Sequence, residues 1–213
     1  MKLKNKRVLI TAGPTWVPID KVRVISNQAT GKTGILLAEQ LQARGAKVTL
    51  LLGPVGAYCP QSNIKLLRFT FFEELRRMLE KELSLKHYDA VIHSAAVADY
   101  KPVGHFSRKV KSNLRKWCLE LMPTRKLIDT IKKIDPAVFL VGFKFEPGVG
   151  AALLLVRAKA LLRRSGADLV VANTVNNQRY EAYLVYPHGT LGPFKSKNRL
   201  ALEVGKQLYK TIS

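Results

Sequence analysis

The chain has 213 residues, a mass of 23.8 kDa, 47% hydrophobic residues and a mean hydropathy of -0.02. These values predict one globular domain with a buried core and exclude an intrinsically disordered chain. No apolar run approaches the ~20 residues of a membrane span, and the apolar stretch behind the basic N-terminus is too short for a signal peptide. Cys59 and Cys118 are isolated, so neither a disulfide framework nor a zinc site is indicated, and a cytoplasmic location is expected.

The charge of the chain is strongly positive. Lys and Arg number 36 against 15 Asp and Glu, which leaves a net charge of +21 and a pI of about 10.2. Such a surface attracts nucleic acid, nucleotides and phosphorylated metabolites alike. The basic residues are spread along the whole chain and form no tail of like charges. The charge therefore favours an anionic ligand without choosing one.

Two periodicities alternate along the chain. Short apolar runs predict strands at 7–11, 47–52, 64–69, 89–93, 137–143 and 167–172. Apolar residues at helical spacing predict helices at 33–44, 72–84, 123–134, 151–164 and 200–212. Residues 181–186 and 191–195 flank Pro187-His188-Gly189, which predicts an antiparallel hairpin.

Strands that alternate with helices imply crossover units around a parallel sheet. We therefore expect an α/β fold, a Rossmann-like doubly wound mostly parallel sheet with a late antiparallel hairpin. No linker or internal repeat divides the chain, so residues 1–213 are expected to form a single domain. Ligands of such folds bind beyond the carboxyl ends of the strands, where the strand order reverses.

A long loop follows the first strand. About twenty residues separate that strand from the helix at 33–44, well beyond the ~2–6 usual for such connections. Its final turn, Ala29-Thr30-Gly31, offers small residues and a helix N-terminus, which predict an anion site. The alternative is a plain glycine-containing helix entry. Gly31-Lys32-Thr33 resembles the end of a Walker loop, but Ser26 stands where its first Gly would be, and the dinucleotide fingerprint GxGxxG is missing.

Two further segments lie where ligands are expected. The fourth strand runs into small residues, Ser94 to Ala98, beside which a flat ring can approach the backbone, and Asp99 can bind a ribose or help to hold a metal. Alternatively, the alanines permit tight packing and Asp99 caps a turn. The basic segment behind it places Lys109 and Lys111 on one side of an extended chain. Two ammonium groups suit transfer at phosphorus, although most basic runs are solvated surface.

Taken together, these segments resemble the phosphopantothenoylcysteine synthetase (phosphopantothenate–cysteine ligase) family of coenzyme A biosynthesis. The matching pieces occur in family order and are Ile10-Thr11-Ala12-Gly13-Pro14-Thr15, Pro18-Ile19-Asp20, Val22-Arg23, Ile25-Ser26-Asn27, Gly31-Lys32, Ala95-Ala96-Val97-Ala98-Asp99-Tyr100, Lys109-Val110-Lys111, Val141-Gly142-Phe143, Glu146 and Asp168-Leu169-Val170-Val171-Ala172-Asn173. In many bacteria this domain is fused behind a flavin-dependent decarboxylase. The present chain is expected to be the free-standing ligase, with no fused flavin decarboxylase domain.

The resemblance implies a two-step ligation. The carboxylate of 4′-phosphopantothenate attacks the α-phosphate of CTP to give an acyl-cytidylate and pyrophosphate, and the amine of L-cysteine then displaces CMP. Mg²⁺ would accompany the nucleotide. Relatives of the eukaryotic type use ATP, so ATP is the alternative co-substrate. The family also implies a homodimer with each site built across the subunit interface, and neither a membrane nor nucleic acid as a physiological partner.

The resemblance also implies roles for individual residues. Asn27 would contact the acyl end of phosphopantothenate and serve the second step, with Arg23 in the same substrate site. Lys109, with Lys111, would serve acyl-cytidylate formation. The nucleotide-binding set is completed by Gly13, Gly31, Ala95, Asp99, Pro123 and Phe143. Metal ligands are left unassigned.

This sequence departs from the family pattern at several positions. They are Trp16-Val17 in the first loop, Ser112 behind the lysine pair, Thr124-Arg125-Lys126 after Pro123, Lys144-Phe145 after Phe143, and the helix before Asp168, where Lys159, Arg163 or Arg164 would replace the family's lysines. These departures affect the preference for CTP over ATP most. The competing hypothesis is a basic nucleic-acid-binding protein on a Rossmann-like scaffold, while an NAD(P)-dependent oxidoreductase is disfavoured by the missing fingerprint.

Overall fold

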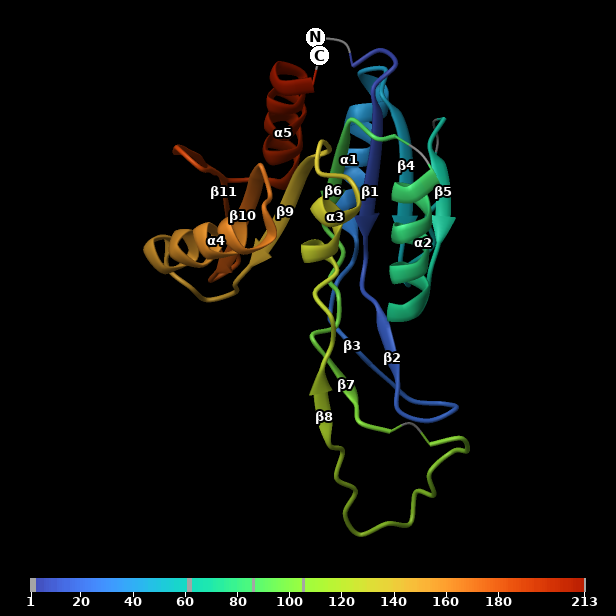
Figure 1. Cartoon of the computed structure of the whole chain (residues 1–213). Coiled ribbons are helices and arrows are strands. Elements are labelled where there is room, and N and C mark those ends of the chain that lie inside the picture. The colour runs from blue at the N-terminus through green and yellow to red at the C-terminus, as the bar shows by residue number, and fades with distance from the viewer. Residues whose placement is uncertain (1–2, 61–62, 86, 105, 213) are drawn as a thin grey trace.

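A computed structural model describes residues 3–60, 63–85, 87–104 and 106–212. At its centre is an eight-stranded sheet with the order β12-β11-β10-β9-β6-β1-β4-β5 (Figure 1). The parallel strands are β1 (Arg7–Ala12), β4 (Lys47–Leu52), β5 (Lys65–Arg68), β6 (Ala90–His93), β9 (Phe139–Phe145) and β10 (Leu169–Asn176). The late hairpin, β11 (Arg179–Tyr186) and β12 (Gly189–Phe194), joins it antiparallel. The expected mostly parallel sheet is confirmed.

Helices cover both faces of this sheet. On one face, α1 (Lys32–Ala43) and α5 (Lys197–Ile212) pack over one apolar core. On the other face, α2 (Phe72–Leu85), α3 (Ile128–Ile134) and α4 (Ala151–Ser165) pack over a second core. Strand β1 supplies both, because Val8 and Ile10 belong to the first core and Leu9 to the second. Two burial faces explain why this strand is a continuous apolar run in the sequence.

The strand order reverses between β1 and β6. From β1 the chain builds outward through β4 to β5, and it then returns to the other side of β1 to add β6, β9 and β10. The loops after β1 and β6 therefore meet at the carboxyl edge of the sheet. The amide of Ala96 donates to the carbonyl of Gly13 at 2.9 Å, and Pro14 and Ala96 form an isolated β-bridge. This is the place where the sequence predicted a ligand.

Two short ribbons project beyond this edge (Figure 1). One pairs β2 (Trp16–Pro18) with β3 (Val24–Ser26), and the other pairs β7 (Tyr100–Pro102) with β8 (Leu121–Pro123), both antiparallel. Residues 103–104 and 106–120 lie in the long loop at the far end of the second ribbon. We call the two ribbons and this loop the extension. No strand of the extension was predicted, and Pro123 was expected to begin a helix, because three-residue strands are too short to show alternation.

The helix predicted from Pro123 is wrong at its start. Pro123 ends β8, where it pairs with Tyr100, and α3 begins only at Ile128. The chain after Pro123 stays extended beside β7, because the amide of Thr124 donates to the carbonyl of Asp99 at 2.9 Å. Within the described part of the chain, no helix combines the length and apolar character needed to cross a membrane.

Candidate active site

A cleft of about 1130 Å³ lies at the carboxyl edge of the sheet. Its walls are the loops after β1, β6 and β9, the start of α1 and one side of α4. Of the residues predicted to bind the substrate or the nucleotide, those that line it are Gly13, Asn27, Gly31, Ala95, Asp99 and Phe143. They come from three separate parts of the chain. The fold therefore brings together most of the predicted nucleotide-binding set.

The N-terminus of α1 opens into this cleft. Gly31 caps the helix in the left-handed region, at φ 68°, and no side chain caps it. A Cβ atom at this position would lie 3.1 Å from Val55 Cγ1 and 3.4 Å from the amide nitrogen of Gly13. Glycine thus permits both the backbone turn and the close approach of the two loops. Amides of a first helical turn beside a cleft form a site for an anion.

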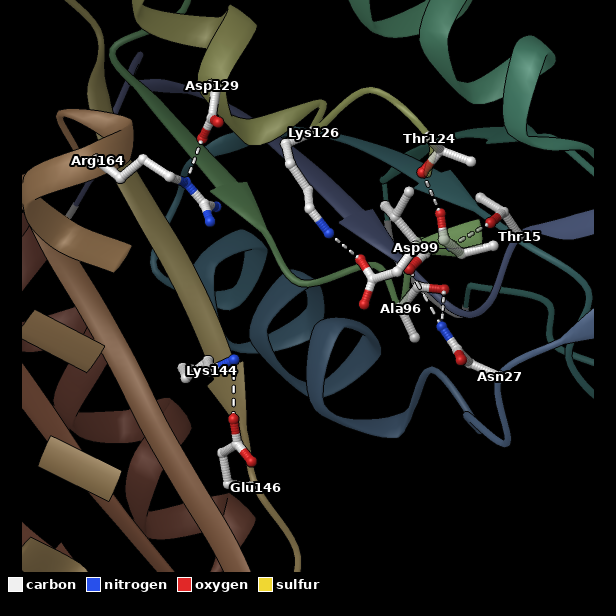
Figure 2. A network of polar contacts seen from close by, with 12 residues as sticks. Thr15, Asn27, Ala96, Asp99, Thr124, Lys126, Asp129, Lys144, Glu146 and Arg164 are labelled. Carbon is white, nitrogen blue, oxygen red and sulfur yellow. Dashed lines mark hydrogen bonds and ion pairs between the residues drawn. The ribbon is translucent and has the colours of Figure 1, made fainter. Parts of the chain in front are cut away.

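The small-residue segment after β6 is held by its backbone. The side-chain amide of Asn27 donates to the carbonyls of Ala96 and Val97, at 3.2 and 3.1 Å (Figure 2). The amide of Ala98 donates to Thr15 Oγ1 at 2.9 Å, and Thr124 Oγ1 donates to the carbonyl of Ala98 at 2.6 Å. The segment is therefore fixed from both sides, and its small side chains leave the backbone open to a ligand.

Four of the cations that line the cleft are paired with carboxylates, and three of these pairs are drawn in Figure 2. Lys126 binds Asp99 at 2.5 Å, and Arg164 binds Asp129 at 3.2 Å. Glu146 accepts from Lys144 at 2.8 Å and from Arg157 at 2.5 Å.

The hydrogen bond from Lys144, assisted by Arg157, holds the pKa of Glu146 below its usual value. Of the helix residues considered as lysine replacements, Arg164 lines the cleft, and Lys159 and Arg163 are not among its lining residues. Sequence reasoning missed Arg157. Its spacing of seven residues from Arg164, two helical turns, was the available signal.

One end of the cleft holds polar groups that sequence reasoning gave no role. Asn173 Oδ1 and the Tyr180 hydroxyl are buried and have no hydrogen-bond partner within the described residues. Lys197, at the start of α5, also lines the cleft, and burial together with the charge of Lys32 lowers its pKa. The two neighbouring lysines suit a negatively charged ligand. Asn173 Oδ1 can accept from a donor group of a ligand, and the Tyr180 hydroxyl can donate or accept. Asn173 directly follows the strand predicted at 167–172 and lies within β10, and this place near the carboxyl end of a parallel strand could have indicated it.

His93 is buried at the carboxyl end of β6. Its Nδ1 lies 2.9 Å from Thr11 Oγ1. Burial lowers the pKa of His93 to about 4, so the ring is neutral near pH 7. This side chain contributes shape and a hydrogen bond to the floor of the cleft, and no positive charge.

The remaining predicted residues lie outside the cleft of their own chain. Lys109 and Lys111 are exposed on the loop of the extension, where they flank the half-buried Val110, although no strand forms there. Arg23 lies at the base of the same loop, with its guanidinium 5.1 Å from the ring of Trp117. Pro123 ends β8, while the four residues that follow it line the cleft.

A metal site is not preformed in the described residues, since no cluster of three or more His, Cys, Asp or Glu side chains occurs there. The carboxylates that line the cleft are Asp99 and Glu146. Such a set fits a Mg²⁺ ion held chiefly by the phosphates of a nucleotide, with one or two carboxylates assisting.

Comparison with known proteins identifies the family. The family described as DNA/pantothenate metabolism flavoprotein C-terminal domain matches residues 3–211. The coenzyme A biosynthesis bifunctional protein CoaBC of Thermococcus kodakarensis is 42% identical over 173 residues, which are 81% of this chain and 42% of that protein. The Bacillus subtilis protein of the same name is 38% identical over 176 residues, 81% of this chain and 41% of that protein. The chain thus spans less than half the length of these relatives.

Solved structures agree with this assignment. The DNA/pantothenate metabolism flavoprotein from Streptococcus pneumoniae is 25% identical, has a TM-score of 0.86, and is matched over 96% of this chain and 99% of that one. The C-terminal domain of a CoaBC protein is 27% identical, with a TM-score of 0.81 over 98% of this chain and 96% of that one. The chain therefore belongs to the DNA/pantothenate metabolism flavoprotein C-terminal domain family, which confirms the resemblance to phosphopantothenoylcysteine synthetases.

Proposed function

We propose that this protein joins 4′-phosphopantothenate to L-cysteine in coenzyme A biosynthesis, through an acyl-cytidylate intermediate. The observation that carries the proposal is the convergence of Asn27, Gly31, Ala95, Asp99 and Phe143 on one cleft at the strand-order reversal. These residues come from the motifs that carry the family resemblance. Relatives that contain the same domain are named for coenzyme A biosynthesis.

In the first step, a carboxylate oxygen of phosphopantothenate bonds to the α-phosphorus of CTP. The bond from that phosphorus to its bridging oxygen breaks, and pyrophosphate leaves with the electron pair. In the second step, the amine of cysteine attacks the acyl carbon, loses a proton and expels CMP. Activation is needed because a carboxylate has no good leaving group, whereas an acyl phosphate ester does.

The cleft has one part suited to the base and ribose of the nucleotide and another part suited to its phosphates. The backbone of Ala95 to Asp99, opposite Phe143, would hold the base and ribose. The first turn of α1, with Lys32 and Lys197 nearby, would hold phosphate. Mg²⁺ would enter with the triphosphate and neutralise part of its charge.

Asn27 would orient the acyl end of the intermediate. Its side-chain amide already lies against the backbone of Ala96 and Val97, so its position is set before a ligand binds.

A homodimer would bring the lysine loop to a cleft. Apolar side chains are exposed on the extension at Val22, Val24, Tyr100, Val103, Phe106, Leu114, Leu121 and Met122. Exposed apolar groups gathered on one projection are typical of an interaction surface. We propose that two extensions pair, and that Lys109 and Arg23 of one chain serve the cleft of the partner subunit.

The decisive experiment is incubation with phosphopantothenate, cysteine, Mg²⁺ and either CTP or ATP, followed by mass spectrometry of the products. The proposal expects phosphopantothenoylcysteine, pyrophosphate and CMP in the CTP reaction. Product formation with ATP alone would leave the ligase assignment standing and correct the nucleotide. The absence of ligated product with both nucleotides would refute the proposed function.

The net charge of +21 favours one competing function, binding of nucleic acid. That hypothesis expects tight binding of DNA or RNA with a steep dependence on salt, and no nucleotide turnover. Gel shifts across a salt series, combined with the turnover assay, separate the two hypotheses. Weak binding that disappears at moderate salt, together with ligated product, would favour the ligase.

A further inference from the structure

The carboxylate of Asp20 is enclosed at the base of the extension. Its side chain has no exposed surface. Oδ1 accepts the backbone amides of Val22 and Arg23, at 2.8 and 2.7 Å, and Oδ2 accepts the backbone amide of Val110 at 3.0 Å and the Arg23 guanidinium at 2.7 Å. Burial opposes ionisation, but the hydrogen bonds led by Val110 outweigh it and lower the pKa of Asp20 to about 2. Asp20 is therefore ionised near neutral pH, and each of its two carboxylate oxygens accepts two hydrogen bonds.

The bond to Val110 differs from the others because it spans 90 residues of sequence. The carbonyl of Val110 is held as well, since it accepts from Arg23 Nη1 at 3.2 Å. Asp20 and Arg23 thus bind both polar backbone groups of the residue between Lys109 and Lys111. Fixing the backbone at Val110 sets the directions from which both lysine side chains leave the loop.

A second set of contacts fastens the same loop. The Arg23 guanidinium lies 5.1 Å from the ring of Trp117, which packs edge-on against Phe106 with ring centroids 5.8 Å apart. The amide of Phe106 donates to the carbonyl of Ile19 at 3.0 Å. The loop is therefore tied to the β2–β3 ribbon at several points, with the ion pair of Asp20 and Arg23 at their centre.

The charge of the loop makes such an anchor necessary. Residues 106–119 contain five cations, Arg108, Lys109, Lys111, Arg115 and Lys116, and no acidic residue. Like charges on a flexible loop repel one another and favour extended, variable conformations. A buried anion that binds the backbone opposes this repulsion without occupying either lysine head group.

We propose that Asp20 is a positioning residue that holds Lys109 and Lys111 ready to neutralise the phosphates of the nucleotide during acyl-nucleotide formation. The inference rests on the proposed function, and it adds a residue that acts through the loop of Lys109 and Lys111 and through Arg23, which holds that loop with it. Phosphoryl transfer depends mainly on positioning and charge, and a misplacement of ~1 Å can cost ~10²-fold in rate. Loss of Asp20 is therefore expected to impair the first step and to spare the attack of cysteine on a preformed acyl-nucleotide.

The test uses Asp20→Asn and Asp20→Ser in the full chain, with Asp89→Asn as the matched control. Serine can still accept the nearby amides of a local turn but cannot reach Val110, so it keeps the test valid if the asparagine variant folds poorly. Asp89 also accepts a backbone amide, that of Arg7 at 2.8 Å, and precedes β6 at the opposite edge of the sheet. Both Asp20 variants are expected to lose ~10²-fold in pyrophosphate release, and the control none.

Combination with Lys109→Gln and Lys111→Gln separates positioning from a general structural role. If Asp20 acts through these two lysines, adding Asp20→Asn to the variant that lacks both causes no further loss of rate. Multiplicative losses would overturn the proposal, as would undiminished pyrophosphate release in the Asp20 variants. Equal loss in the cysteine step would also contradict it.

A spectroscopic readout tests the anchor independently of catalysis. In a Trp16→Phe background the other tryptophan of the chain, Trp117, reports on the loop. Asp20→Ser is expected to raise its quenching by acrylamide, and Asp89→Asn to leave it unchanged. Unchanged quenching would overturn the anchoring role. If the wild type released no pyrophosphate with either nucleotide, the proposed function would fail while this readout still decided whether Asp20 fixes the loop.

Discussion

The cleft and the extension differ in how their backbone is held and in how much of their side-chain surface is exposed. The cleft is walled by backbone at the ends of fully buried strands, and its segments are locked by hydrogen bonds such as that from Ala98 to Thr15. The extension has three-residue strands, exposed apolar side chains and a long basic loop. A cleft with a fixed backbone can select a ligand by its shape. A basic loop can stabilise negative charge once its backbone is held in place. Under the proposed function, ligand selection and charge stabilisation would therefore reside in separate parts of this chain.

Charge is arranged differently in the two regions as well. In the cleft, Lys126, Lys144, Arg157 and Arg164 each bind a carboxylate. Within the described residues, neither Lys109 nor Lys111 on the extension has an acidic partner. Their charge is therefore available to an incoming anion without the breaking of an ion pair.

The largest expected effect lies on the extension. Lys109→Gln should lower CTP-dependent pyrophosphate release by ~10²–10³-fold, because a preorganised positive charge at the reacting phosphate is lost. Lys116→Gln, an equally exposed change on the same loop, is the control and should have little effect. Stopped assays of released pyrophosphate measure both. Undiminished release by Lys109→Gln would remove this lysine from the mechanism.

The next effect probes the rigid floor of the cleft. His93 has a pKa of about 4 when folded against 6.5 as the ordinary value, so the unfolded chain binds the extra proton between these pH values. Stability from this group is therefore complete above about pH 6.5 and falls by ~3 kcal/mol as the pH drops to about 4. Urea unfolding of wild type and His93→Asn should show a difference that shrinks over this range. A constant difference would contradict the buried neutral ring.

A backbone contact beneath the cleft gives the third effect. A Cβ atom at Gly53 would lie 2.1 Å from the carbonyl oxygen of Pro14 and 2.8 Å from Phe69 Cε2. Gly53→Ala should therefore destabilise the fold by ~1–3 kcal/mol through overpacking. Gly56→Ala is the control, since a Cβ there meets nothing within 4 Å. Equal midpoints of thermal unfolding for the two variants would show that this part of the cleft is not rigid.

A substitution at Asn27 tests whether the cleft serves the second step of the reaction while the extension serves the first. Asn27→Asp cannot donate to the carbonyls of Ala96 and Val97, so the acyl-nucleotide should be held poorly for attack by cysteine. A loss of about 10-fold in the second step is expected, equivalent to about one or two neutral hydrogen bonds. Mass spectrometry of the quenched reaction should show the accumulated acyl-nucleotide. If the acyl-nucleotide were found at the same level as in the wild type, Asn27 would have no role in the second step.

The smallest effect concerns the ion pair between Lys126 and Asp99. Both side chains are substantially exposed, 42% and 64%, so Lys126→Ala should change unfolding stability by less than ~1 kcal/mol. Freeing Asp99 at the edge of the cleft should nevertheless shift the KM for the nucleotide by about two- to fivefold. Steady-state titrations with CTP and with ATP measure this shift. An unchanged KM for both would exclude Asp99 from nucleotide binding.

Much of the fold was predictable because burial imposes periodicity. The strand at 47–52 has the same bounds in the sequence prediction and in the structure, and α4 differs from its prediction by one residue. Gly31 and Asn27, two residues predicted for the site, both line the cleft, and their roles there stay predictions. The ribbons of the extension were missed, because their strands are stabilised by pairing between distant segments and carry no pattern of their own.

The sequence by itself determined the alternation of strands and helices, the family and the identity of the basic loop, since these depend on local periodicity and on motifs in order. Tertiary structure alone decided that Arg157, Tyr180 and Lys197 line the cleft, and that Lys109 lies outside it. It also revealed the contact between Asp20 and Val110. The physical reason is that side chains from distant segments meet only when the sheet is assembled, and their separation along the chain gives no measure of their distance in space.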